Sequence, residues 1–309
     1  IFKLKNKKLK EVESTLFNLE KDIQTIVENN TEELFEIKLI KSEFTVGDYR
    51  IDSLCFDEES NSFVIVEYKK DKSYSVIDQG YSYLSTMLNN KSDFVLELIE
   101  NSDLSIKKDQ IDWSQSRIIF VSPSFSSYQK NSVNFKDVPF ELWEISKFSH
   151  DLIHFHQITS TSKESISNIG GNKKSVIGDV GKEIQVYDEE SHFSRVNPNV
   201  KDLYLELKER MSSWEGVGYR VKKHYITVVN QNKNKIYLNL QKNRIKIHIL
   251  RRIDYDGKVK DMKVIHNLKD PNKLFKIKRD SHKELYEYFL QDDKDLDYLV
   301  LLLKQKYDS

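Results

Sequence analysis

Three short apolar segments separated by polar turns lie in the first quarter of the chain, and their pattern predicts a β-meander. They cover residues 34–44, 49–56 and 63–70, with the turn sequences TVGD and DEESNS between them. Apolar residues at spacings of three and four precede the meander over 11–29 and follow it over 75–89, which predicts a helix on each side. The third segment, FVIVEYKK, is so apolar that we expect it to be buried on both faces.

The pattern between residues 90 and 158 completes a mixed sheet flanked by helices. RIIFVS is a continuous apolar run of the kind found in interior strands, and two further strands follow it. The expected elements are helices over 94–100 and near Tyr128, and strands over 117–122, 140–146 and 152–158. We therefore expect an α/β domain over residues 1–158.

Residues 159–199 are dominated by Ser, Thr, Asn and Gly and show little periodicity, which is typical of a polar linker. A second, smaller domain is expected over 200–309, with helices on one face of an antiparallel sheet in an α+β fold. Its expected elements are a helix over 200–211 capped by Asn199, strands over 219–230, 235–241 and 244–253, and helices over 281–291 and 295–306.

Charge divides the 309 residues into two parts of opposite sign. Charged side chains make up 32% of the chain and balance at 49 basic against 49 acidic residues. Residues 200–309 hold 25 of the basic and 16 of the acidic ones, a formal charge of +9, so the first 199 residues carry −9. This split suggests that the second domain touches a polyanion while the first gathers carboxylates.

Cysteine usage and hydropathy exclude several classes of protein. The single cysteine, Cys55, rules out an internal disulfide and a cysteine-based zinc site, and its apolar surroundings predict a small core residue. No apolar run approaches the ~20 residues that cross a bilayer, and no secretory signal sequence is visible. We therefore expect a cytoplasmic protein with no membrane partner.

The meander carries the most informative polar residues. Asp52 lies on its second strand, and Glu67 and Lys69 end its third strand on one face, roughly 7 Å apart. Two carboxylates with the main-chain carbonyl of Tyr68 between them make an oxygen site suited to Mg²⁺ or Mn²⁺. Lys69 can orient a water or offset charge on a phosphorane-like transition state. The alternative is a solvent-facing, salt-bridged strand end, because E-x-K is common in so charged a chain.

Two further sets of residues leave alternatives open. Glu20 borders the apolar face of the first predicted helix, where it can point into a site or simply rest at the boundary. His154 and His156 alternate on one strand face and can in principle bind a metal. Because no third ligand stands at a convincing spacing, we favour an exposed strand face for both histidines.

The order helix, three strands, helix, strand, with D…E-x-K on the second and third strands, resembles the PD-(D/E)XK nuclease superfamily over roughly residues 10–158. The sequence segments RIDSLCFD, FVIVEYKK and QGYSYL carry the resemblance, which is closest to the domain of archaeal and actinobacterial mismatch-type (NucS-like) endonucleases. Ile51 stands where the proline of the superfamily's name is expected. In the second domain, IYLNL and DLDYLVLLLKQKY resemble an uncharacterised bacterial domain sometimes labelled a predicted transport protein, a label that no membrane segment supports.

The superfamily resemblance implies a restriction-endonuclease-like fold and assigns roles to individual residues. Asp52, Glu67 and Lys69 correspond to the metal and catalytic set, with Glu20 where many members carry a first-helix acid. Gln79 and Tyr83, four residues apart on the helix after the meander, correspond to a pair beside the site; Gln79 is placed with the catalytic set and Tyr83 with nucleic-acid contacts.

The second domain contains a long basic stretch with no acid. Between Gly216 and Ile253 there are ten Lys or Arg residues, interleaved with tyrosines. Alternate positions on a sheet gather such residues on one face, which is typical of a phosphate-backbone reader; the alternative is a solvated basic face. The expected nucleic-acid contacts are Arg220, Lys222, Lys223, Arg244, Lys246, Arg251 and Arg252.

Three functions fit these patterns. The first is a Mg²⁺- or Mn²⁺-dependent endonuclease acting on nucleic acid, with DNA favoured, aided by the basic second domain and working as a monomer or homodimer. The second is a catalytically silent nuclease-like protein that only binds nucleic acid. The third is an interaction or sensor module. The intact D…E-x-K set favours the first.

Overall fold

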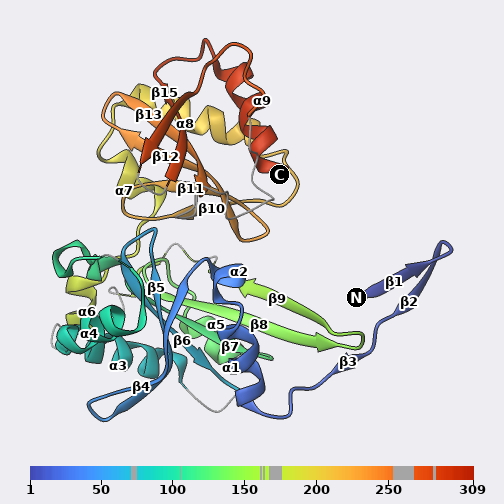
Figure 1. Ribbon diagram of the computed structural model, residues 1–309, viewed down its shortest axis with the longest axis vertical. Helices are drawn as coiled ribbons and strands as arrows, with labels where there is room; N and C mark the ends of the chain where they lie inside the picture. The colour runs from blue at the N-terminus through green and yellow to red at the C-terminus, as the bar shows by residue number, and fades with distance from the viewer. Residues whose placement is uncertain are drawn as a thin grey trace. The chain divides into compact units, whose positions relative to one another are not determined.

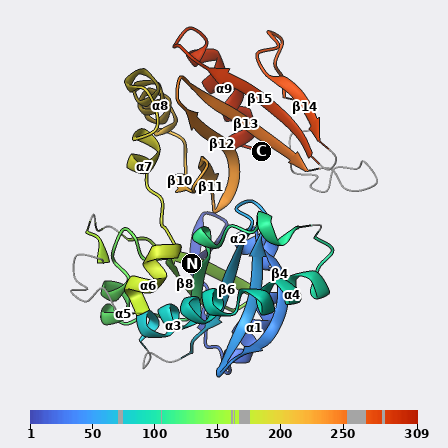
Figure 2. The same cartoon turned by 90° about the vertical axis from the view of Figure 1, so that its left-hand side faces the viewer.

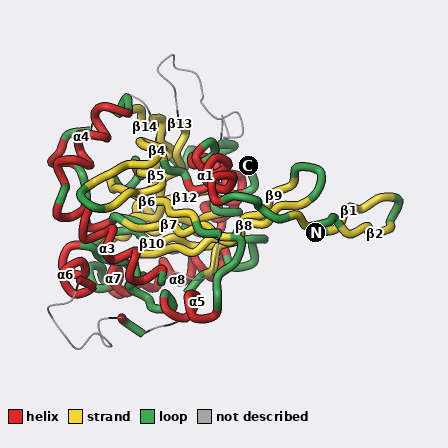
Figure 3. Tube along the Cα trace, turned by 90° about the horizontal axis from the view of Figure 1, so that it is seen from below, coloured by secondary structure: helices red, strands yellow, loops and turns green. Residues whose placement is uncertain are grey.

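The chain folds into two compact units, residues 1–186 and 187–309. The structure is a computed structural model that describes residues 1–70, 75–104, 106–160, 162, 164–166, 176–252, 268–280 and 283–309. Figures 1 and 2 show each unit as a sheet with helices packed on it, and Figure 3 maps helix and strand along the trace. Within the described ranges, no helix is long and apolar enough to cross a membrane.

The first unit is built on a mixed sheet, as the sequence predicted; the sheet has seven strands, one of them at residues 14–15, where a helix was predicted. Its order is β3-β8-β7-β6-β5-β4, with β9 paired to β8; β6, β7 and β8 are mutually parallel neighbours and the other pairs are antiparallel. The strands are β3 (Ser14–Thr15), β4 (Lys38–Val46), β5 (Tyr49–Asp57), β6 (Ser62–Tyr68), β7 (Arg117–Ser122), β8 (Phe140–Phe148) and β9 (Leu152–Ile158). A separate hairpin of β1 (Phe2–Lys5) and β2 (Lys8–Glu11) precedes them.

Helices cover both faces of this sheet. On one face, Ile65 and Phe120 pack with Leu84 of α3, and on the other, Val66 packs with Ile23 of α1. All seven residues of β6 are buried, as its apolar sequence predicted. The helices are α1 (Glu20–Glu28), α2 (Thr31–Phe35), α3 (Val76–Asn89), α4 (Lys91–Asn101), α5 (Ser127–Ser132) and α6 (Val176–Glu183), with short 3-10 turns η1 (Lys108–Gln110) and η2 (Trp113–Gln115).

The second unit is α+β, with an antiparallel six-stranded sheet in the order β10-β11-β12-β13-β15-β14. Ile245 and Ile247 point from β13 into a core that includes Leu207 of α8 and Leu302 of α9. Its elements are α7 (Glu189–Phe193), α8 (Pro198–Met211), β10 (Val217–Val221), β11 (Ile226–Asn230), β12 (Lys233–Gln241), β13 (Arg244–Arg252), β14 (Lys276–Asp280), β15 (Lys283–Leu290) and α9 (Leu296–Tyr307).

Several predicted elements differ in extent or type near the start of the chain. The helix predicted over 11–29 begins only at Glu20, because β3 pairs with the end of β8. Leu16 and Leu19, which the helical spacing placed on its apolar face, are 88% and 60% exposed. The strand predicted over 34–44 begins at Lys38, since α2 continues to Phe35 and the next residue, Glu36, takes a left-handed conformation (φ 56°).

The largest error concerns the helix predicted over 281–291: residues 283–290 form strand β15, and 281 and 282 lie outside the described residues. The period of two in β15 places Tyr286, Tyr288 and Leu290 opposite the isoleucines of β13, and this cross-strand packing outweighs the helical spacing of its apolar residues. The strand β14 was not predicted, and the strand expected over 219–230 is a hairpin, β10 and β11. The predicted helix over 295–306 matches α9.

The segment predicted as a linker, 159–199, is divided between the units. Val180 and Ile184 are buried in the core of the first unit, while Phe193 and Val196 pack against the core of the second. Asn199 does not cap α8, which begins at Pro198 after Asn197. Cys55 is buried in the core as predicted.

Candidate active site

Asp52 and Glu67 lie together where the β5–β6 ladder ends. Ser53 and Val66 are the last paired residues of β5 and β6 at this end of the sheet. Just past this pair, the Asp52 carboxylate accepts the N–H of Tyr68 at 3.0 Å. Asp52 therefore holds the backbone of β6 at the residue whose carbonyl was predicted as a metal ligand. Only 3% of Glu67 is exposed, so this end of the sheet holds an acid in the interior.

Three donors surround one oxygen of Glu67. Its Oε1 accepts from Lys69 Nζ at 2.7 Å and Gln79 Nε2 at 2.7 Å, and the Tyr83 hydroxyl lies 3.3 Å away. Its Oε2 is buried and accepts no hydrogen bond from an N–H or hydroxyl group of the described residues, and the neighbouring Asp52 carboxyl can bond to Glu67 only when one of the two acids is protonated. A buried carboxylate oxygen without a partner is costly, so an additional positive group at this oxygen would stabilise the site.

Helix α3 positions Gln79 and Tyr83 through helical spacing and close packing. The two side chains are four residues apart and bond to each other at 3.0 Å. Gly80 lies between them on the side of the sheet, where a Cβ would stand 2.5 Å from the Phe140 ring. Only glycine lets α3 approach β8 this closely, and the approach brings the Gln79 amide to Glu67.

Electrostatics in the site favour a bound cation. Burial, and then the charge of Asp52, raise the pKa of Glu67 to about 7, against the opposing effect of Lys69. Burial also raises the pKa of Asp52, and the charge of Glu20 adds to this effect, while the Tyr68 N–H and Lys69 oppose it. Two desolvated carboxylates with raised pKa values repel each other, and a divalent ion would relieve that repulsion.

The donors fit a hard divalent cation that keeps several waters. Asp52, Glu67 and the Tyr68 carbonyl supply oxygens, and the Oε2 of Glu67, which accepts no N–H or hydroxyl of the described residues, is the observation that supports the fit. Glu20 reaches the same strand end, but its Oε2 accepts the N–H of Lys70 at 2.9 Å. Within the described residues, no group of three or more His, Cys, Asp or Glu side chains is arranged to hold a metal.

A buried polar network on α1, which was not predicted, supports the site from the other face of the sheet. Gln24 donates to the main-chain carbonyl of Asp52 at 3.2 Å and to Glu28 at 2.9 Å. Ser53 donates to Glu28 at 2.6 Å and bonds to the Tyr68 hydroxyl at 2.9 Å. The available signal was a glutamine beside Ile23 on the apolar face of a predicted helix.

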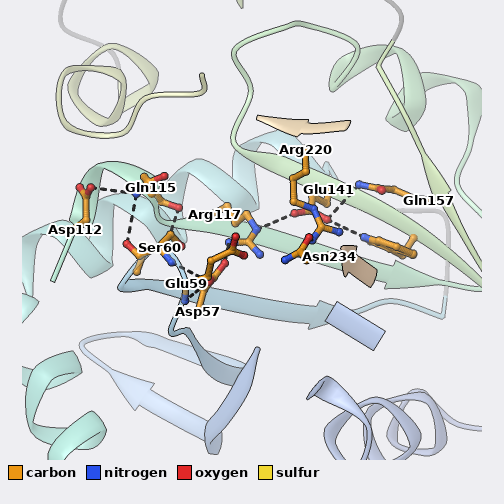
Figure 4. A network of polar contacts seen from close by, with 12 residues as sticks. Asp57, Glu59, Ser60, Asp112, Gln115, Arg117, Glu141, Gln157, Arg220 and Asn234 are labelled. Carbon is orange, nitrogen blue, oxygen red and sulfur yellow. Dashed lines mark hydrogen bonds and ion pairs between the residues drawn. The ribbon is translucent and has the colours of Figure 1, made fainter. Parts of the chain in front are cut away.

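A second polar network lies at the opposite end of β5 and β6 (Figure 4). Arg117 bonds to Asp57 at 2.9 Å and to Glu141 at 2.8 Å, and Glu141 also accepts from Trp143. The two carboxylates hold the pKa of Arg117 above its usual value despite burial. Each acid has a direct cationic partner, so this network joins β5, β7 and β8 as a structural brace.

The predicted histidine pair is exposed, as favoured. His154 and His156 lie on one face of β9 with rings stacked at 6.3 Å.

The basic residues of the second unit occupy different environments. The Arg244 guanidinium lies 3.9 Å from the Phe289 ring, and Arg220 donates to Asn234 at 3.0 Å. Lys246 pairs with the buried Glu287 at 2.6 Å, and Lys278 pairs with the same acid, so two of the basic charges share an acidic partner. Lys222 and Lys223 lie in the β10–β11 turn, and Arg251 and Arg252 in β13, with side chains outside the described part of the chain.

Sequence comparison places the chain in a family. No protein-family model matches it. A protein of Haemophilus influenzae, named only as an uncharacterized protein, is 35% identical over 99% of this chain and 98% of its own length. The chain therefore belongs to the same family as this protein.

Three solved structures are similar to part of the chain. A repair endonuclease from Pyrococcus abyssi is 19% identical over 38% of this chain and 44% of its own, with a TM-score of 0.26. A complex of EndoMS with double-stranded DNA is 19% identical over 42% of this chain and 46% of its own, with a TM-score of 0.29. Pyrococcus furiosus SfsA in complex with Ca²⁺ is 15% identical over 44% of this chain and 61% of its own, with a TM-score of 0.24. The match spans less than two thirds of each structure, and at these scores any assignment of chemistry rests on the site itself.

Proposed function

We propose that the first unit is a Mg²⁺- or Mn²⁺-dependent nuclease of the PD-(D/E)XK type that hydrolyses phosphodiester bonds in DNA. The observation that carries the proposal is the buried Glu67, whose Oε1 is saturated with donors while its Oε2 has none among the described residues. Lys69 pairs with Glu67 at one oxygen only, and a second buried acid, Asp52, raises the pKa of Glu67, so the arrangement is better explained by chemistry than by stability.

Each residue has a distinct role in this proposal. Asp52, Glu67 and the Tyr68 carbonyl would hold the metal, which when bound polarises the phosphate and lowers the pKa of a water ligand. Lys69, whose ammonium lies 2.7 Å from Glu67, would donate to the attacking water or to a non-bridging phosphate oxygen. Gln79 would hold the Glu67 carboxylate in one orientation. Tyr83, predicted as a nucleic-acid contact, is only 5% exposed and its hydroxyl donates to the Arg50 carbonyl, so it would support Gln79 and not reach the nucleic acid.

The second unit would bind the phosphate backbone. Arg220, Lys222, Lys223 and Arg244 are candidates for these contacts, whereas Lys246 shares Glu287 with Lys278 and so contributes less charge. Binding through such contacts should weaken steeply as salt concentration rises, since phosphate contacts release counterions from DNA.

The test is cleavage of plasmid and of single- and double-stranded oligonucleotides with Mg²⁺, Mn²⁺ or EDTA. Asp52→Asn removes a proposed ligand charge, and Asp48→Asn, four residues earlier at an exposed position, is the matched control. We expect metal-dependent cleavage by the parent and by Asp48→Asn, and at least a roughly 100-fold loss in Asp52→Asn. Salt-sensitive binding without cleavage under any of these conditions would instead identify a catalytically silent binder, and no binding at all would favour an interaction module.

A further inference from the structure

A continuous chain of hydrogen bonds on the α1 side of the sheet begins and ends at residues that carry the proposed metal ligands. Ser53 donates to Glu28 at 2.6 Å, and a serine hydroxyl has one proton, so the Tyr68 hydroxyl donates to Ser53 at 2.9 Å. Gln24 donates to the same oxygen of Glu28 at 2.9 Å and to the main-chain carbonyl of Asp52 at 3.2 Å. One carboxylate on α1 therefore links the Tyr68 side chain to the Asp52 main chain.

This chain of hydrogen bonds lies inside an apolar core. Ser53 and Tyr68 are fully buried, and Gln24 is 6% exposed. Tyr68 packs in the cluster that contains Ile23 and Val66. Buried polar groups are costly unless they are bonded, and a bonded network holds its members in one arrangement. Apolar groups of the same shape can replace a buried hydrogen-bonded pair at little cost in stability, so the network is better explained by the geometry that it imposes.

That geometry concerns the end of β6. Tyr68 is the last residue of β6 and lies past the final pair of the β5–β6 ladder, so the ladder does not fix it on the side of β5. Successive side chains of a strand point to opposite faces, so a Tyr68 anchored toward α1 turns Glu67 and Lys69 toward α3. The contact of Glu67 with Gln79 of α3 agrees with this arrangement. The Tyr68 N–H is held separately, by the Asp52 carboxylate at 3.0 Å.

We propose that Ser53 and Glu28 are positioning residues of the metal site. Neither touches the ion. Through the Tyr68 phenol and, by way of Gln24, the Asp52 main chain, they hold the Asp52 carboxylate and the Tyr68 carbonyl in place for a divalent ion. This role rests on the metal site of the proposed function. Removing a group that orients metal ligands typically weakens metal binding by about 10–100-fold, so the loss of affinity should exceed what a general loss of stability produces.

The experiment measures the Mn²⁺ affinity of the full chain by isothermal titration calorimetry and its stability by urea unfolding. Tyr68→Phe removes only the hydroxyl, and Ser53→Ala breaks the bond to Glu28. The matched control is Ser62→Ala at the opposite end of β6, where a fully buried serine bonds to Ser60 at 2.8 Å. We expect Tyr68→Phe and Ser53→Ala to raise the Kd for Mn²⁺ by at least about tenfold, and the control to change it by less than about twofold.

The double variant, Ser53→Ala with Tyr68→Phe, tests whether the two side chains act through one link. Both substitutions break the same hydrogen bond, so the double variant should bind Mn²⁺ within about twofold of the weaker single variant. Given a parent that binds Mn²⁺, three results overturn the positioning role: unchanged affinity in both single variants, an equal loss in Ser62→Ala, or losses that multiply in the double variant. A parent that binds Mn²⁺ but cleaves no DNA overturns the nuclease function alone, whereas a parent that binds no Mn²⁺ overturns both.

Discussion

Replacing Glu67 by glutamine should stabilise the metal-free protein at alkaline pH, although it removes the central acid of the proposed site. The folded pKa of Glu67 is about 7, against 4.5 for an unperturbed glutamate. A pKa raised on folding adds stability only while the group stays protonated, so stability is lost as pH rises from about 4.5 through 7 and then levels off. Above pH 8, this rise in the pKa of Glu67 lowers the free energy of unfolding by about 3 kcal/mol relative to its value at acid pH.

The amide of the Glu67→Gln variant would keep an acceptor for Lys69 and Gln79 and remove the repulsion with Asp52. For a unit of this size, about 3 kcal/mol raises the melting temperature by roughly 5–10 °C. The assay is thermal unfolding at pH 5 and pH 8.5 in EDTA and in Mn²⁺. We expect Glu67→Gln to melt above the parent at pH 8.5 in EDTA, near it at pH 5, and to show none of the parent's stabilisation by Mn²⁺. The matched control is Asp48→Asn, which should follow the parent in all four conditions.

Two results would contradict a destabilising Glu67 anion: a variant that melts below the parent at pH 8.5, or a change in melting temperature that is the same at both pH values. The first result would mean that Glu67 is stabilised as an anion by Lys69 and Gln79. The second would mean that its protonation does not change on folding. Stabilisation of both proteins by Mn²⁺ would place the metal elsewhere.

Three further changes have defined outcomes. Gly80→Ala should lower stability by about 1–3 kcal/mol in urea unfolding and reduce cleavage, because the new Cβ meets the Phe140 ring and displaces α3. Glu287→Gln should raise DNA affinity and steepen its salt dependence in fluorescence anisotropy, because it frees the charge of Lys246. Unchanged binding would show that this face of the second unit does not contact DNA. Arg117→Met should cost about 3–5 kcal/mol in urea unfolding, because two acids lose their buried partner, while Mn²⁺ affinity by calorimetry stays unchanged.

The parts of the site that depend on local periodicity could be predicted from the sequence. Alternation along one strand placed Glu67 with Lys69, and helical spacing placed Gln79 with Tyr83; the structure brings all four into contact. The mixed sheet followed from the apolar segments and their turns. None of these inferences required knowledge of which strands are neighbours.

The rest depended on tertiary contacts that local patterns do not contain. The Gln24 contact with Asp52 joins residues that are 28 apart in the sequence. The sequence indicates it only through a polar residue on the apolar face of a predicted helix. The pairing of Lys246 with Glu287 depends on the register of β13 and β15, and β15 itself was predicted as a helix because its apolar residues fit both periods. A count of basic residues therefore overestimated the uncompensated charge on that sheet.

The most direct test of the proposed nuclease site compares Lys69→Met with Lys70→Met in single-turnover cleavage of DNA with Mn²⁺. The two lysines are adjacent, but only Lys69 contacts Glu67, while Lys70 donates to the carbonyl of Asn18. We expect cleavage by the parent that EDTA abolishes, a rate slower by at least about 100-fold in Lys69→Met, and less than a roughly threefold change in Lys70→Met. Equal rates in the two variants, or a parent that does not cleave DNA, would contradict the proposed nuclease site.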